Sequence, residues 1–345
     1  MTDRRRGEWS PLQGGTMRRR RSRRPLGVAL ALVFAVGAGG GAALYDATDE
    51  GGGGGSRGTP PAAAVVQPPA KLRPPPELRD ELQPKPPPGI ELPTENLVAV
   101  RFKRPPRAGL LLDLDTGRVL WARRPLEVLP IASLTKIMTA LIVVERTEAG
   151  DRARISRNAV RFRGSGVGVL PRGKRVPVEA LMYGMLLPSG NDAATALAEH
   201  VAGSDRRFAR LATRRAHDLG LGCTRFVSSF GLESGNRSCA ADLAALARLA
   251  MRQPRIARIV RQAHARLRFP IKGRYLDVST TNPLLKDGYP GTIGLKTGFT
   301  NRAGHCLVAV VRRGGHTLAA VLLHSPDTDR QARRLIGAGF RAVGG

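Results

Sequence analysis

Ser133 and Lys136 have the residue types and the spacing of a nucleophile beside its base. They lie in the stretch 131–140, which reads Ile-Ala-Ser-Leu-Thr-Lys-Ile-Met-Thr-Ala. In a helix, residues three apart share one face, so the lysine amine can reach the serine hydroxyl and take its proton. The apolar run from Ile137 to Val144 predicts a helix buried in a core, with Ser133 held rigidly at its amino end. On its own, the same pattern also describes a helix N-cap followed by a solvated lysine.

A second polar stretch, Ser189-Gly190-Asn191, is expected on a short loop between two helices, because Pro188 ends the apolar helical pattern before it. Beside a serine nucleophile, Ser189 can relay a proton to the departing amine. Asn191 can hold a substrate amide or the amine of Lys136. Taken singly, this stretch is an ordinary polar turn.

A third stretch, Lys296-Thr297-Gly298, falls on an expected strand. Lys296 and Thr297 can bind a terminal carboxylate, and Gly298 lets a substrate lie against the strand. The backbone amides of Ser133 and Phe299 would then form an oxyanion hole. Because the three stretches supply every part that a serine nucleophile needs to cleave an amide, their joint occurrence on helix, loop and strand favours catalysis over coincidence.

The elements that must position these residues follow a simple order along the chain. Two strand-like runs flank an Asp-Thr-Gly turn in the stretch 108–121, which predicts a hairpin. Helical patterns fill the middle, and strands return after Thr280, before a last helix. We therefore expect an α+β fold in which one antiparallel sheet is built from both ends of the domain and is covered by helices. The expected helices are 178–187, 192–201, 205–219, 240–251 with Ser238 as its cap, and 327–342; the late strands are 292–297, 305–312 and 317–324.

The sequence before residue 96 differs in composition from the rest of the 345 residues. Nine arginines lie within the first 24 residues, and residues 1–25 are expected to form a basic cytoplasmic region. The apolar segment 26–45 is long enough for a membrane anchor or an export signal, and whether it is cleaved stays open. Residues 46–95 are rich in glycine and proline and are expected to be a disordered tether. The catalytic domain is expected at 96–345.

The net charge of +29 does not indicate nucleic-acid binding in this arrangement. Arginines are concentrated ahead of the apolar segment, and the others are scattered without the aromatic residues of a single-strand-binding surface. An exported domain with a solvated basic surface fits better. Such a surface can attract anionic polymers of the cell envelope.

From about residue 96 to its end, the chain resembles the low-molecular-mass D-alanyl-D-alanine carboxypeptidases, which are serine penicillin-binding proteins. Beyond the three motifs, the resemblance rests on the stretches 112–117, 186–194, 230–232, 281–282 and 294–300. It implies the β-lactamase/penicillin-binding (DD-peptidase) fold, removal of the terminal D-alanine from peptidoglycan stem peptides through an acyl-serine, and acylation by β-lactams. No cofactor or metal is implied. Many members carry an added strand-rich domain and a C-terminal amphipathic helix that attaches them to the membrane. In this chain one helix is expected after the last strand, so its attachment to the membrane would come from residues 26–45 instead, with the catalytic domain outside the cytoplasm.

Two other functions stay open on the sequence. A β-lactamase would share the acylation machinery but would need a glutamate for rapid deacylation; between residues 192 and 295 only Glu199 and Glu233 are present. A non-catalytic wall-binding module would explain the fold, although every catalytic position is filled. Cys223 and Cys239 flank the 230–232 loop and are a hypothetical disulfide, as is usual in exported proteins, whereas Cys306 is expected to be buried.

Overall fold

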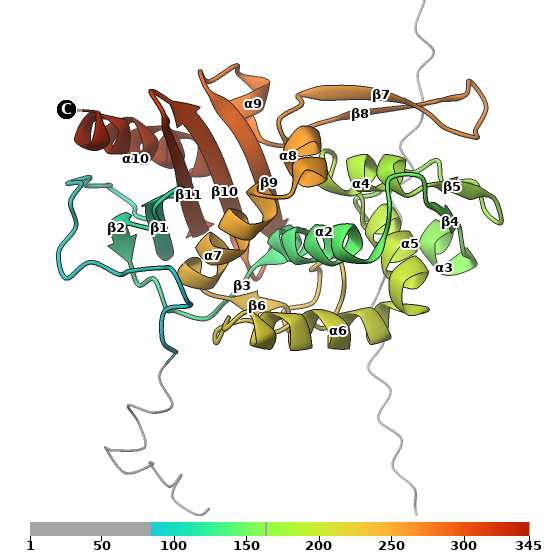
Figure 1. Ribbon diagram of the computed structural model, residues 1–345, viewed down its shortest axis with the longest axis horizontal. Coiled ribbons are helices and arrows are strands. Elements are labelled where there is room, and N and C mark those ends of the chain that lie inside the picture. Colours follow the sequence, from blue (N-terminus) through green and yellow to red (C-terminus); the bar gives the residue numbers. More distant parts are fainter. Residues whose placement is uncertain (1–83, 163, 345) are drawn as a thin grey trace, which may run out of the picture. The chain divides into compact units, whose positions relative to one another are not determined.

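A five-stranded antiparallel sheet organises the computed structural model, which describes residues 84–162 and 164–344. The strand order is β2-β1-β11-β10-β9, so strands from both ends of the domain lie side by side (Figure 1). This arrangement confirms the predicted α+β architecture. The strands are β1 (Ala108–Asp113), β2 (Val119–Arg123), β9 (Thr292–Thr300), β10 (Gly304–Arg313) and β11 (His316–Ser325).

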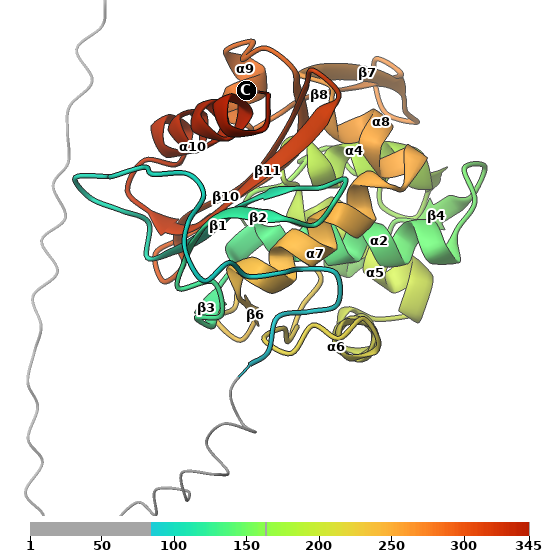
Figure 2. The same cartoon turned by 60° about the vertical axis from the view of Figure 1, so that its left-hand side comes forward.

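Each face of the sheet contributes to a different part of the core, because successive side chains of a strand point to opposite faces. On β11, Leu318, Ala320 and Leu322 pack with helix α10 (Thr328–Val343), whose Leu335 and Ile336 are fully buried. The intervening residues of β11 belong to the main core, which includes α7 (Ala240–Met251) and α2 (Thr135–Arg146). Figure 2 shows α10 and α7 on opposite faces of the sheet.

Helix α2 runs through the helical part of the fold and packs against several other helices. Nine of its residues are buried, including Lys136. Because a buried helix is apolar on most sides, the apolar run after Lys136 was a good signal for α2. The other elements are η1 (Ala132–Leu134), α3 (Arg157–Arg161), α4 (Val178–Leu186), α5 (Asn191–Ala202), α6 (Asp205–Asp218), α8 (Pro254–Val260) and α9 (Pro283–Lys286), with short strands β3 (Leu129–Pro130), β4 (Arg152–Arg154), β5 (Arg175–Pro177), β6 (Arg237–Ser238), β7 (His264–Arg268) and β8 (Tyr275–Ser279).

Most predicted elements are found within one or two residues of their expected ends, but two expectations need correction. Ser238 does not cap α7, because it belongs to β6 and pairs with Leu129, and the N-cap position is occupied by Cys239. The folded part also begins before residue 96. Ile90 is buried in the main core, and Glu91 forms a backbone bridge with Arg118.

The predicted basic region 1–25, the membrane or signal segment 26–45 and the tether up to residue 83 lie outside the described residues. Within residues 84–162 and 164–344, every helix is too short or too polar to cross a membrane.

Candidate active site

The structure places Ser133 and Lys136 in contact at the start of helix α2. Ser133 lies in the single turn η1, and its Oγ is 2.9 Å from Lys136 Nζ. Ala132, just before the serine, has a φ of +47°, a left-handed conformation that is costly for a non-glycine residue. Because the serine is in the first turn, its backbone N–H has no acceptor within the helix and is available to a ligand.

The Lys136 amine is fully buried and meets three oxygen atoms. Besides Ser133 Oγ, Nζ lies 2.6 Å from Asn191 Oδ1 and 2.9 Å from the Phe230 carbonyl oxygen. Burial lowers the pKa of Lys136 well below its usual value, and the positive charge of Lys296 lowers it further. A neutral amine has two donors and one lone pair. In its neutral form this amine donates to the two carbonyl-type oxygens and accepts the hydroxyl proton of Ser133, which is the arrangement of a base beside its nucleophile.

The loop between α4 and α5 brings the second stretch to this amine. Asn191 is the first residue of α5 and is almost fully buried, so its side chain is fixed against Lys136. Ser189 precedes it on the loop with a φ of +66°, a second strained position in the site. A Cβ on Gly190 would lie 2.7 Å from the Gly184 carbonyl oxygen, so only glycine fits between Ser189 and Asn191.

The third stretch lies on β9, the edge strand of the sheet, and touches the nucleophile directly. A Cβ on Gly298 would lie 3.0 Å from the backbone nitrogen of Ser133, so the absence of a side chain allows strand and helix to approach closely. Phe299 follows with 54% of its surface exposed, and its ring stacks on His305 with 4.5 Å between centroids.

Lys296, on the same strand, is buried almost as completely as Lys136. Its Nζ donates to the Thr297 carbonyl oxygen at 3.0 Å. Burial lowers the pKa of Lys296 to about 7. Near neutral pH its charge therefore depends strongly on whether an anion is beside it.

Thr281 connects the second and third stretches. Its backbone N–H and its hydroxyl both donate to the Leu187 carbonyl oxygen, and its Oγ1 lies 2.5 Å from Thr297 Oγ1. Asn282 next to it donates to the Gly294 carbonyl oxygen at 2.9 Å. The first predicted stretch thus contacts each of the other two, by Lys136 with Asn191 and by Ser133 with Gly298, and Thr281 links the third stretch to Leu187, two residues before Ser189.

The Phe230 carbonyl is part of the site, although no pattern of residue types marks a backbone oxygen. It is held by a tightly packed loop: Gly231 has a φ of +92°, and a Cβ there would overlap the Ala132 carbonyl oxygen. Thr139 also donates to the Ser229 carbonyl oxygen at 2.7 Å. The disulfide Cys223–Cys239, hypothesised from the sequence, closes the chain around this loop.

The segment Ser165–Gly168 also lies against the site, although it belongs to none of the three stretches predicted from the sequence. The Asp192 carboxylate accepts from the backbone amides of Val167 and Gly168, at 2.8 and 2.9 Å. The Asn191 amide donates to the Ser165 carbonyl oxygen at 2.8 Å. The acidic residue after Asn191 was the available signal, since a buried carboxylate needs donors.

Each of the two glutamates considered for deacylation has its carboxylate engaged in hydrogen bonds with other residues. Glu233 accepts from Ser228 Oγ and Asn236 Nδ2 within its own loop. Glu199 lies two turns along α5 from Asn191 and accepts from Asn158. In the described part of the chain, the cluster that could meet a metal ion combines Asp242 with the two disulfide sulfurs, which are not free thiolates.

The sequence of this chain matches the family model described as D-alanyl-D-alanine carboxypeptidase over residues 105–327, which contain all three stretches. It is 34% identical over 234 residues to the D-alanyl-D-alanine carboxypeptidase DacF of Bacillus subtilis, covering 66% of this chain and 59% of that protein. It is 33% identical to the D-alanyl-D-alanine carboxypeptidase DacB2 of Mycobacterium tuberculosis, covering 68% and 82% of the two chains. The chain thus spans less than two thirds of the length of the Bacillus relative.

Among solved structures, the Streptomyces K15 DD-transpeptidase is similar with a TM-score of 0.66 and 28% sequence identity. The match covers 70% of this chain and the whole of the transpeptidase. The predicted penicillin-binding fold is therefore confirmed, and the chain belongs to the D-alanyl-D-alanine carboxypeptidase family.

Proposed function

We propose that this protein is a serine-type D-Ala-D-Ala carboxypeptidase that removes the terminal D-alanine of peptidoglycan stem peptides. The observation that carries the proposal is the contact of the second and third stretches with the first around one serine, with a buried lysine amine 2.9 Å from its hydroxyl oxygen. Family membership supplies the substrate class. The names of the relatives are consistent with it.

In the proposed acylation, Ser133 Oγ attacks the carbonyl carbon of the penultimate D-alanine while neutral Lys136 takes the hydroxyl proton. Asn191 and the Phe230 carbonyl keep the amine oriented toward the serine. The negative charge on the former carbonyl oxygen is stabilised by the backbone amides of Ser133 and Phe299.

Collapse of the tetrahedral intermediate breaks the peptide bond and leaves an acyl-serine. Ser189 relays the proton from Lys136 to the nitrogen of the departing D-alanine. Protonated Lys296 and the Thr297 hydroxyl bind the carboxylate of that D-alanine, so a peptide without a free C-terminus is a poor substrate. Water then hydrolyses the acyl-serine, which returns the serine hydroxyl and releases the shortened peptide.

We further propose that the catalytic part acts outside the cytoplasm, attached through the segment 26–45 or released if that segment is cleaved. The Cys223–Cys239 disulfide supports an oxidising compartment. β-Lactams are the expected inhibitors, because they acylate the same serine.

The test is incubation of the full chain with a synthetic peptide ending in D-Ala-D-Ala, with free D-alanine as the product measured. We expect release by the wild type and none by Ser133→Ala, and a labelled penicillin should mark only the wild type. Absence of both D-alanine release and labelling would refute the proposal. Release of the penicilloyl group in well under a second would favour a β-lactamase instead.

A further inference from the structure

A basic hollow lies at the far end of helix α5 from the active site. Its volume is about 600 Å³, and it is bordered by α5, by the start of α3 and by the strand β4 with the turn before β5. Asn191 begins α5, whereas Glu199 and His200 line the hollow; eight residues of helix correspond to roughly 12 Å along the axis. The hollow is therefore separate from the catalytic residues but rigidly connected to them.

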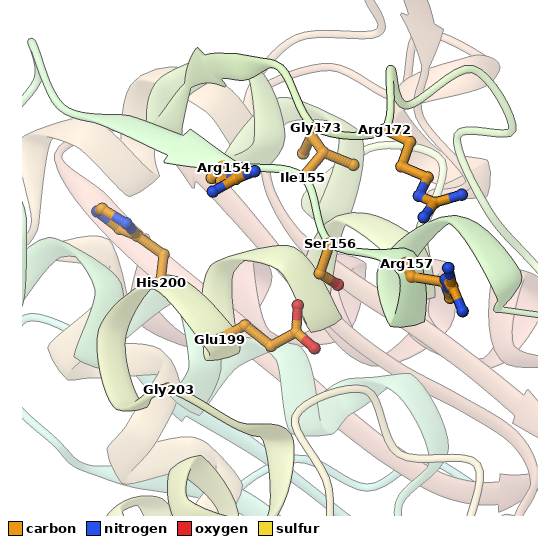
Figure 3. Close-up of a pocket in the computed structure, with 9 residues that line it drawn as sticks. All are labelled: Arg154, Ile155, Ser156, Arg157, Arg172, Gly173, Glu199, His200 and Gly203. Carbon is orange, nitrogen blue, oxygen red and sulfur yellow. The ribbon is translucent and has the colours of Figure 1, made fainter.

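Arginine side chains surround this hollow without acidic partners. Arg154, Arg157 and Arg172 are exposed, and within residues 84–162 and 164–344 none of them forms a salt bridge. Figure 3 shows Arg154 and His200 on one side of the hollow and Arg157 and Arg172 on the other. Like charges held around one space repel each other, so the arrangement favours an anion that neutralises several of them.

Glu199 adds an acceptor to the lining of this basic hollow. Its Oε1 accepts from Asn158 Nδ2 at 3.2 Å, whereas its buried Oε2 has no hydrogen-bond partner in the described part of the chain. A buried carboxylate oxygen without a donor is costly. Glu199 as a whole is only partly buried, so a rotation of its side chain would expose Oε2 to the hollow. A ligand that carries a hydroxyl as well as negative charge would then satisfy both the arginines and this oxygen.

We propose that the hollow binds a polyol-phosphate polymer of the cell envelope. Guanidinium groups match phosphate oxygens in charge and geometry, so Arg154, Arg157 and Arg172 bind its phosphates. Once the Glu199 side chain has turned toward the hollow, its Oε2 accepts a hydroxyl of the polyol. A phosphodiester chain can enter a hollow between arginines, whereas a flat membrane surface cannot reach all of its walls. The inference rests on the extracytoplasmic location proposed above, and it assigns a second binding site that holds the enzyme on envelope polymers beside its substrate.

The test is calorimetric titration of the full chain with synthetic oligo(glycerol phosphate). The triple variant Arg154→Ala/Arg157→Ala/Arg172→Ala should bind about tenfold more weakly or worse, which corresponds to about 1.4 kcal/mol or more. Its dependence of log K on log salt concentration should be shallower by about two, because fewer counterions are released. The matched control Arg118→Ala/Arg252→Ala/Arg341→Ala removes the same charge from exposed positions away from the hollow and should change the dissociation constant by less than about twofold.

Glu199→Ala tests the hydroxyl contact with a second probe. The variant should bind oligo(glycerol phosphate) more weakly but inorganic polyphosphate more tightly, since polyphosphate lacks the hydroxyl and is only repelled by the carboxylate. Equal losses in the two triple variants would reduce the effect to net charge and overturn the proposal. Tighter binding to phosphatidylglycerol vesicles than to the soluble polymer would overturn it as well, as would stronger binding of both probes by Glu199→Ala.

Labelling by penicillin separates this proposal from the proposed function. All variants of the hollow should be acylated at Ser133 as the wild type is, which also shows that they are folded. A failure of polymer binding leaves this labelling intact, whereas a failure of the proposed function abolishes it in the wild type.

Discussion

Lys136→Met is expected to slow acylation strongly while changing how stability depends on pH. Methionine has nearly the length of lysine and suits the apolar surroundings of α2, but it offers no base. Loss of a positioned general base lowers rates by about 10²–10⁴. Labelling by penicillin should therefore slow by at least about 100-fold in a protein that is still folded.

The pH dependence follows from the lowered pKa of Lys136. In the unfolded chain the amine binds a proton up to about pH 10.4, whereas in the folded protein it is neutral well below that value. Between the two pKa values the unfolded state holds one more proton, so the stability of the wild type rises with pH by about 1.36 kcal/mol per unit. Lys136→Met lacks this contribution. At low pH the variant gains stability over the wild type because it does not bury an amine, and this gain shrinks as pH rises through the same range.

The measurement is urea unfolding of both proteins at pH 8.0 and pH 9.5. The free energy of unfolding of the wild type minus that of Lys136→Met should increase between these two pH values, by at most about 2 kcal/mol. Lys296 also titrates with a lowered pKa, but it is present in both proteins, so its effect on the difference largely cancels. A difference that is the same at both pH values would mean that Lys136 is protonated in the folded protein, and the neutral-base mechanism would then be wrong.

Three further results are expected. Because burial lowers the pKa of Lys296 to about 7, its carboxylate-binding form is lost as pH rises: KM for a D-Ala-D-Ala peptide should increase about tenfold per pH unit above 7, and Lys296→Arg should flatten this rise. Gly231→Ala should lower the free energy of unfolding by about 2 kcal/mol or more, whereas Gly222→Ala, with open space around its Cβ, should change it by less than about 0.5 kcal/mol in the same urea titration. Replacing Cys223 and Cys239 by alanine should cost about 3 kcal/mol, since the disulfide closes a loop with a sequence separation of 16, and an unchanged midpoint of unfolding would contradict this role.

Elements whose residues alternate or repeat with a clear period could be predicted from the sequence. Helix α7 has the expected bounds, and β10 and β11 differ from expectation by one residue at each end, because both are almost continuously apolar. The hairpin β7–β8 was not expected, although its exposed and buried residues alternate, because each strand is short and has only two apolar residues on its buried side. The burial of Ile90 was missed for a similar reason, since a single apolar residue among prolines has no period.

The side chains of the site were predictable from the sequence, whereas the backbone groups that hold them were not. Ser133, Lys136 and Asn191 are recognised by type and spacing, and the structure brings them within hydrogen-bond distance. The Phe230 carbonyl accepts from the same amine but carries no mark in the sequence. Thr281 joins two stretches through a hydroxyl that many surface threonines also have. Such contacts depend on tertiary packing, and only the fold shows them.

The two buried lysines must hold opposite charges for the proposed reaction. Lys136 acts as a base only when neutral, and Lys296 binds a carboxylate only when protonated. Burial lowers the pKa of both amines; the charge of Lys296 acts to lower the pKa of Lys136 as well, whereas Asp192 and Glu233 act to raise it. Protonated Lys296 thus favours the neutral form of Lys136, which is the combination of charges that the proposed reaction requires. When the substrate carboxylate neutralises Lys296, its effect on Lys136 weakens, and the amine becomes a stronger base at the moment when the serine proton must be taken.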